Sequence, residues 1–209
     1  MKINDPLNKI LDNEVKVKIL RFFIKTTGQW NGRQIAKEVG VAPATAHKAL
    51  QGLYKEGALI LRNVGKTHLY NLKEDTYLVS DLLRPLFTKE DKVLNNIVET
   101  IKDKIGASTN TKKDIVSVSL FGSVSLAKER STSDIDLAVI IRNAKRRQKV
   151  ESLFEEIDKE ISSKFGNTVS PYINTEAEFR AKCKKKLAVI RNILLNNKRI
   201  YGKEAKEIL

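Results

Sequence analysis

Cysteine and long apolar runs are scarce in this sequence of 209 residues. Its single cysteine, Cys183, excludes an internal disulfide. No apolar run approaches the roughly 18 to 20 residues that cross a bilayer. The opening MKINDPLNKI also lacks the apolar stretch of a secretory signal. Together these absences predict a cytoplasmic protein in a reducing compartment, with no membrane segment.

Acidic residues are outnumbered, with 25 Asp and Glu against 39 Lys and Arg, a formal charge of +14. Such an excess favours an anionic partner, with nucleic acid or nucleotide ahead of a membrane surface. The alternative is a generally basic, lysine-rich surface. Apolar residues make up 41% of the chain, enough for packed cores, and the length predicts two small domains.

Three helices followed by a hairpin are expected in the first part of the chain. Apolar residues at helical spacing and turn residues at the ends predict helices over 7–25, 33–39 (ending at Gly40) and 42–56 (with Pro43 in its first turn). Two short apolar runs, ALILR and HLYNL, then predict a hairpin that turns near Gly65.

This order of elements points to a known domain. The segment RQIAKEVGVAPATAHKALQGLYKEGALI resembles the helix-turn-helix of bacterial and archaeal winged-helix transcription regulators, and the likeness spans about residues 6–75. The resemblance implies a winged helix-turn-helix domain over residues 1–75 that binds double-stranded DNA. Its third helix would pack through Ala46, Leu50 and Leu53. The side chains expected to face DNA, from this helix and the hairpin wing, are Thr45, His47, Lys48, Gln51, Arg62 and Lys66. A protein-docking module is the alternative.

Residues 76–110 are predicted to form a helical connector with a break at Pro85. A stripe of apolar residues at steps of four then follows, at Val93, Ile97, Ile101 and Ile105. A stripe of this kind must pack on something. Two partners remain open, the sheet of the following domain and a second copy of the chain in a homodimer.

Two aspartates stand at the start of a predicted strand in the second half. A strand through IVSVSL ends in Gly122 and Ser123, and ten residues later come Asp134 and Asp136, followed by the apolar run LAVII. Side chains at positions i and i+2 of a strand project side by side. Adjacent carboxylates repel unless a positive charge lies between them. The pair therefore predicts a site for Mg²⁺ or Mn²⁺, which prefer oxygen ligands.

The remaining elements are a helix over 144–166, a third strand, TVSPYIN, and a helix over 176–196 that begins with a capping box at Thr175 and Glu178. Helices alternating with strands predict a mixed α/β (α+β) domain over residues 111–209.

The Gly-Ser pair, ten residues and Asp-x-Asp resemble the minimal nucleotidyltransferases of the DNA polymerase β superfamily, over about residues 114–203. The resemblance implies that Gly122 lets the phosphates of an NTP such as ATP approach the backbone, and that Ser123 bonds the triphosphate. It further implies that Asp134 and Asp136 are catalytic and hold divalent metal. The implied reaction transfers a nucleoside monophosphate to a hydroxyl-bearing acceptor.

The chain departs from the family pattern in two places. Leu126 and Ala127 stand where many members have Arg and Gly, and the strand NTVSPYI lacks the usual third carboxylate, with Ser170 and Tyr172 at the expected positions. A DNA-binding regulator with a nucleotide-sensing or inactive domain is therefore the alternative function. A toxin–antitoxin component that modifies a protein acceptor is a third, suggested by similar nucleotidyltransferases.

Overall fold

The computed structural model describes residues 2–209, which form two compact units, the first ending at Lys92 and the second starting at Val93. Each unit has its own hydrophobic core. The helical connector expected over residues 76–110 is divided between the units, because its first half packs into the first core and its second half into the second. Among the described residues no helix is long and apolar enough to span a bilayer.

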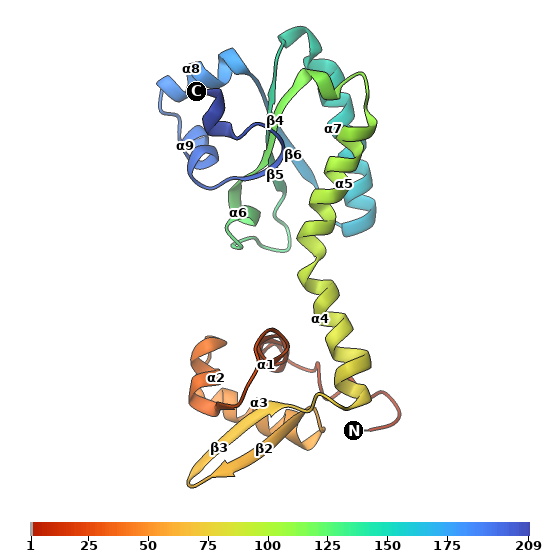
Figure 1. Cartoon of the computed structure of the whole chain (residues 1–209), viewed down its shortest axis with the longest axis vertical. Coiled ribbons are helices and arrows are strands. Elements are labelled where there is room, and N and C mark those ends of the chain that lie inside the picture. Colours follow the sequence, from red (N-terminus) through yellow and green to blue (C-terminus); the bar gives the residue numbers. More distant parts are fainter. Residues whose placement is uncertain (1) are drawn as a thin grey trace. The chain divides into compact units, whose positions relative to one another are not determined.

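The first unit is a winged helix-turn-helix (Figure 1). Its antiparallel sheet has the order β1-β3-β2. The elements are α1 (Glu14–Lys25), β1 (Trp30–Asn31), α2 (Gly32–Glu38), α3 (Pro43–Lys55), β2 (Leu59–Val64) and β3 (Thr67–Leu72). The expected order of helices and hairpin is confirmed, and β1 is a short strand that the sequence pattern did not indicate.

The first helix is shorter than predicted. It begins at Glu14 rather than at residue 7, because the Asn13 side chain accepts the Lys16 N–H at 3.0 Å and caps the helix. The segment before it forms turns that still bury Ile10. Apolar spacing alone cannot reveal such a cap inside a longer stripe.

The helix-turn-helix itself follows the prediction closely. Gly40 ends the second helix with φ +67°, a left-handed conformation that favours glycine. Pro43 starts α3, where a missing N–H costs little. The expected inner face of α3 is buried, with Ala46, Leu50 and Leu53 fully inaccessible to solvent.

Pro85 does not break the connector. A π-helical turn (Leu78–Leu83) leads directly into α4 (Arg84–Asp91), and Pro85 lies in the first turn of α4. The wider turn lets the Arg84 N–H reach the Val79 carbonyl, and Pro85, which has no N–H to donate, follows directly in the first turn of α4.

The second unit is a four-stranded mixed sheet with the order β6-β5-β4-β7. The strands are β4 (Ile115–Leu120), β5 (Ile135–Ile141), β6 (Val169–Thr175) and β7 (Lys198–Gly202). Strand β5 pairs antiparallel with β4 and parallel with β6, and β7 pairs antiparallel with β4. This mixed sheet with flanking helices confirms the expected α+β class.

Helices cover both faces of this sheet (Figure 1). Helices α5 (Val93–Ala107) and α7 (Arg147–Phe165) pack on one face, and α8 (Glu176–Lys184) and α9 (Ala188–Leu195) on the other. Short helical turns complete the unit at Lys112–Asp114, Gly122–Ser125 (α6), Ala144–Arg146 and Ala205–Ile208.

The packing of α5 shows which core the apolar stripe of the connector joins. Ile97, Ile101 and Ile105 of α5 are buried in the core formed with α7 and the sheet, whereas Val93 is exposed. The stripe is therefore accounted for by the second unit itself and needs no second copy of the chain.

The C-terminal region differs from the prediction in two ways. The helix expected over 176–196 is divided into α8 and α9 at Lys186, which has φ +52°. Strand β7, which pairs with β4, was not expected. The capping box at Thr175 and Glu178 is present as predicted.

Candidate functional site

Asp134 and Asp136 lie at the start of β5. Along this strand Leu137 and Val139 enter the core beneath α5 and α7, while Ala138 and Ile140 enter the core beneath α8 and α9. Because strand side chains alternate, Asp136 lies on the α8 and α9 face. Asp136 is half-buried and Asp134 is exposed.

Gly122 meets Asp136 at close range. It follows β4, has φ +76°, and a Cβ built on it would lie 2.2 Å from Oδ2 of Asp136. Only glycine leaves room for this carboxylate and allows the backbone turn. The structure therefore brings together Gly122 and Asp136, which are 14 positions apart in the sequence.

Ser123 lies in the same turn, whose shape is fixed by Ser125. The Ser125 hydroxyl is 2.8 Å from the carbonyl oxygens of both Gly122 and Asn196. The half-buried Ser123 hydroxyl has no hydrogen-bond partner among residues 2–209. Downstream, Ala127 has φ +51°, so the position where related sequences carry glycine does adopt a glycine-like conformation here.

The two carboxylates carry uncompensated negative charge. Burial, and then the charge of Asp134, raise the pKa of Asp136. No Lys or Arg within residues 2–209 pairs with either aspartate, and the Thr168 hydroxyl donates to Asp134. Two hard oxygen donors that repel one another fit a divalent cation such as Mg²⁺ or Mn²⁺.

A third acid is missing from this site. Among the described residues no cluster of three His, Cys, Asp or Glu side chains could hold a metal. Ser170 of β6 pairs in register with Asp136, and Tyr172 pairs with Ala138, so Ser170 takes the place beside the aspartates. Strand β6 runs five positions beyond Ser170, roughly 17 Å at about 3.3 Å per residue, before Glu176 begins α8 at the far end of the strand. Glu176 therefore cannot substitute for the absent carboxylate.

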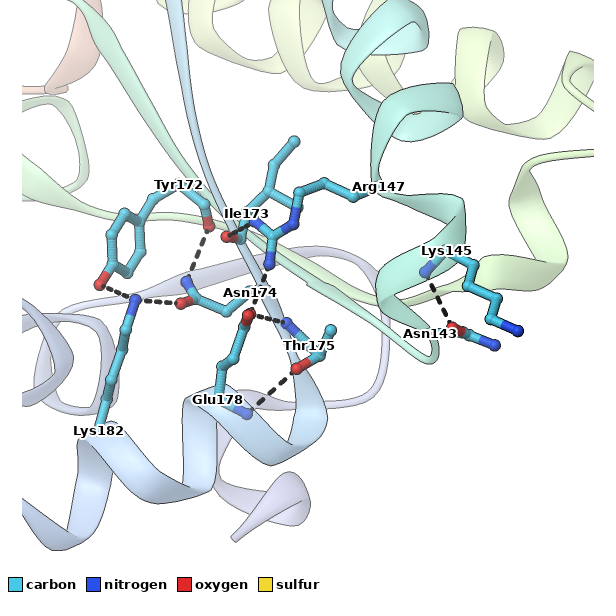
Figure 2. Close-up of polar contacts among 9 residues, drawn as sticks. All are labelled: Asn143, Lys145, Arg147, Tyr172, Ile173, Asn174, Thr175, Glu178 and Lys182. Carbon is cyan, nitrogen blue, oxygen red and sulfur yellow. Dashed lines mark hydrogen bonds and ion pairs between the residues drawn. The ribbon is translucent and has the colours of Figure 1, made fainter.

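A lysine that the sequence pattern did not single out lies on the same face of β6. Nζ of Lys182 is 2.9 Å from the Tyr172 hydroxyl and 2.5 Å from Oδ1 of Asn174, and 4.7 Å from the centre of the Tyr172 ring (Figure 2). Its partners are neutral, so the face keeps one positive charge. The sequence could have indicated this lysine, because Lys182 lies three residues after the buried Phe179 and so on the side of α8 that faces the sheet.

A basic cavity lies beside the recognition helix α3. About 460 Å³ in volume, it is lined by side chains from the start of α2, from α3 and from the wing, among them Arg33, His47, Lys66 and His68. His47 and Lys66 were predicted from the sequence, whereas Arg33 was not. These groups come together because β1 pairs with β3, bringing the start of α2 beside the wing.

The other predicted DNA-facing residues are spread more widely. Thr45 and Lys48 are exposed and line a separate cavity beside the start of α1. Arg62 is exposed on β2. Gln51 is half-buried and donates to the Tyr70 hydroxyl at 3.1 Å, which ties it to the wing.

Comparisons with known families agree with both units. The family described as IclR helix-turn-helix domain matches residues 16–59, and the family described as Polymerase beta, Nucleotidyltransferase matches residues 103–206. The chain is a helix-turn-helix domain fused to a polymerase β-type nucleotidyltransferase domain. The comparison with curated proteins returned no match.

Solved structures resemble parts of the chain. They include the transcriptional repressor BigR from Xylella fastidiosa (20% identity, TM-score 0.34), which covers 40% of this chain and 81% of its own. The homodimeric winged helix-turn-helix DNA-binding domain of Mb0332 from Mycobacterium bovis (24%, 0.36) covers 44% and 81%. A toxin–antitoxin complex with AMP-PNP (16%, 0.33) covers 51% and 79%.

Proposed function

We propose that the nucleotidyltransferase domain transfers a nucleoside monophosphate from an NTP such as ATP to a hydroxyl-bearing acceptor. The observation that carries the proposal is a pair of carboxylates, Asp134 and Asp136, that no Lys or Arg within residues 2–209 neutralises, with Asp136 directly against Gly122. In the reaction the acceptor oxygen bonds the α-phosphorus, the bond between the α-phosphorus and the oxygen that bridges it to the β-phosphate breaks, pyrophosphate leaves with that oxygen, and the proton of the acceptor hydroxyl is released to solvent.

Each residue of the site has a role in this proposal. Asp134 and Asp136 would hold Mg²⁺ or Mn²⁺, which would supply charge stabilisation of the phosphoryl oxygens. Gly122 leaves space for phosphate to approach the main chain, since it has no side chain there. Ser123 would donate its unpartnered hydroxyl to the triphosphate.

The test compares the wild-type chain with Asp134→Asn and Asp136→Asn. Each substitution is expected to weaken Mg-NTP binding at least tenfold in titration calorimetry and to abolish pyrophosphate release. Asp103→Asn, which alters an exposed aspartate of α5, is the matched control and should change neither. Unchanged NTP affinity in both site variants would contradict the assignment.

The alternative is a regulator whose nucleotidyltransferase domain binds nucleotide without efficient transfer. Ser170 in register with Asp136 favours it, because a serine replaces the third acid. Loss of one well-placed catalytic group commonly costs about a hundredfold to a thousandfold. If transfer by the wild-type chain is slow and Ser170→Asp raises it, the missing acid is what limits the rate.

For the N-terminal domain we propose binding to double-stranded DNA in the cytoplasm. Arg33, His47, Lys66 and His68 around one cavity between α3 and the wing support phosphate and groove contacts. Replacing His47 with Ala should weaken binding to the preferred duplex more than to random duplex, measured by fluorescence anisotropy. A homodimer would allow paired half-sites to be read, and sedimentation with and without DNA would reveal it. A protein acceptor would appear as label transferred from the NTP to a partner.

A further inference from the structure

A second basic cavity lies at the other end of the nucleotidyltransferase sheet from the aspartates. It has a volume of about 500 Å³ and is lined by the turn before β4, the residue after β5 and the end of β7. Its charged lining residues are Lys112, Lys113, Arg142 and Lys203. Arg142 lies six positions after Asp136 along β5, which is roughly 20 Å at about 3.3 Å per residue.

The positive charge of this cavity is not neutralised locally. None of its lining residues is acidic, and its three lysines have no carboxylate partner among residues 2–209. The neighbouring Asp114 lies 3.7 Å from Arg146, and Glu204 lies 3.4 Å from Arg199, so each of these acids already faces another cation. Four positive groups around one open cavity favour an anion that carries several charges.

Two of the four cationic residues have main-chain groups that are held by hydrogen bonds. The Arg142 N–H donates to the Asp114 carbonyl at 2.9 Å and its Nε to the Lys113 carbonyl at 3.1 Å, which leaves the two terminal nitrogens of the guanidinium for a ligand. Such a fork matches phosphate oxygens. A group held in place before binding loses less entropy when the ligand arrives.

Lys203 is held in a similar way. Its N–H donates to the Val116 carbonyl at 2.9 Å, and its own carbonyl accepts the Ser117 hydroxyl at 2.7 Å. The preceding Gly202 has φ +72°, and a Cβ there would lie 2.1 Å from the Val116 oxygen. The close approach of β7 to β4 therefore depends on glycine and carries Lys203 to the rim of the cavity.

From this arrangement we infer a phosphate-binding site, separate from the nucleotidyltransferase centre, that takes the phosphate chain of a free nucleotide or of a single nucleic-acid strand. Its volume lies within the range of small-ligand pockets, about 300 to 1,000 Å³. The site does not depend on transfer activity, because none of its residues contacts Asp134 or Asp136.

The experiment titrates the full chain, without divalent metal and at low salt, with inorganic tripolyphosphate and separately with a labelled oligothymidylate. The double variant Arg142→Gln/Lys203→Gln should weaken binding at least tenfold. So should Lys112→Gln/Lys113→Gln, whose side chains make no hydrogen bonds to other residues within 2–209. Lys149→Gln/Lys159→Gln, which removes two exposed charges from α7, is the matched control and should change affinity less than twofold.

The outcomes separate the sources of phosphate. Cavity-dependent binding of tripolyphosphate indicates a free nucleotide, and cavity-dependent binding of the oligonucleotide alone indicates a nucleic-acid backbone. Asp134→Asn/Asp136→Asn should retain either interaction, which distinguishes this site from the catalytic one. Equal weakening in the α7 control, or no binding of either probe by the wild type, would overturn the inference.

Discussion

Gly122 lets the turn after β4 approach the Asp136 carboxylate, because it has no side chain. Its φ of +76° disfavours any other residue, and a Cβ would overlap the Asp136 carboxylate. We expect Gly122→Ala to lower the free energy of unfolding by about 1 to 3 kcal/mol, because it combines backbone strain with overpacking. It should also displace Asp136 and weaken Mg-NTP binding.

Urea unfolding and calorimetry with Mg-NTP measure these two effects. Gly106→Ala is the matched control, since Gly106 lies within α5 and a Cβ there meets nothing within 4 Å. That substitution should stabilise the chain by about 0.5 to 1 kcal/mol through helix propensity. A neutral Gly122→Ala would mean that the turn can relax away from the carboxylate.

Asp136 gives the site a pH dependence. Its folded-state pKa is raised by burial and by Asp134, so its stabilising contribution is present in full below the unfolded pKa and is lost as pH rises through the folded pKa. Without divalent metal, Asp136→Asn should therefore have a slightly higher Tm than the wild type at pH 7. The difference should shrink as pH falls toward about 4, where an aspartate protonates.

Melting curves in EDTA from pH 4 to 8 would show this narrowing gap. The effect should be small because solvent screens the half-exposed carboxylate. Adding Mg²⁺ should raise the Tm of the wild type and leave Asp136→Asn unchanged. Parallel curves at every pH would show that the two aspartates do not strain the metal-free fold.

Among the helices and strands, local chemistry decided what could be predicted. Gly40, Pro43 and the Thr175 capping box mark element ends by their own backbone or side-chain preferences, and each is where the sequence placed it. The break between α8 and α9 at Lys186 was not predicted, because a run of lysines is compatible with a continuous helix. Strand β7 forms by pairing with β4, and no local sequence pattern predicts this pairing.

The candidate site shows the same division. The sequence predicted that the Gly-Ser pair follows one strand and that Asp-x-Asp opens the next, and the structure has both there. Which of Ser170 and Tyr172 pairs with Asp136 could not be decided from the sequence, since register between β5 and β6 is a property of two strands separated by a helix of 19 residues. The same holds for Arg33, which joins the wing through tertiary packing alone.

Strand β6 lies at the edge of its sheet, and charged side chains form hydrogen bonds with its outward-facing main-chain groups. The Ile135 N–H bonds the Thr168 carbonyl at 2.8 Å, so Val169, Pro171, Ile173 and Thr175 direct their main-chain groups outward. Asp158 accepts the Val169 N–H at 2.7 Å, and Pro171 has none to offer. Arg147 donates to the Ile173 carbonyl at 2.8 Å, and Glu178 accepts the Thr175 N–H at 2.8 Å (Figure 2). Capped edges of this kind resist pairing with another strand.

Removing one cap should expose the edge. Arg147→Ala loses bonds to Ile173 and Glu178 and is expected to cost about 1 to 2 kcal/mol of unfolding free energy. It should also promote association that rises with concentration, seen by light scattering. Arg146→Ala is the control, since it breaks only the long 3.7 Å pair between the exposed Arg146 and the half-buried Asp114, and it should cost well under about 1 kcal/mol.

Glu178 adds a pH signature to the same experiment. Its pKa is lowered, first by the Thr175 N–H bond and then by Arg147. Its contribution is therefore present above the unfolded pKa and is lost as pH falls through the folded pKa. Arg147→Ala should reduce this acid-side loss without removing it, because the main-chain bond remains. An unchanged acid limb would show that the ion pair contributes nothing.

In the molecule as a whole, two separate cores carry two candidate functions, and the transferase and sensor proposals differ in whether these are coupled. A nucleotide sensor requires that Mg-NTP change DNA affinity, and thermodynamic linkage then makes the effect reciprocal, typically 5- to 150-fold. A transferase needs no such coupling.

We therefore expect saturating Mg-NTP to change duplex affinity less than about twofold, measured by anisotropy at several salt concentrations. Lys66→Ala should lower the salt dependence by about one unit in both conditions, because one phosphate contact is lost. Asp136→Asn should leave both curves unchanged. A nucleotide-dependent shift larger than about fivefold that disappears in Asp136→Asn would contradict the transferase proposal and establish the domain as a sensor, since only differential binding to two states can move that equilibrium.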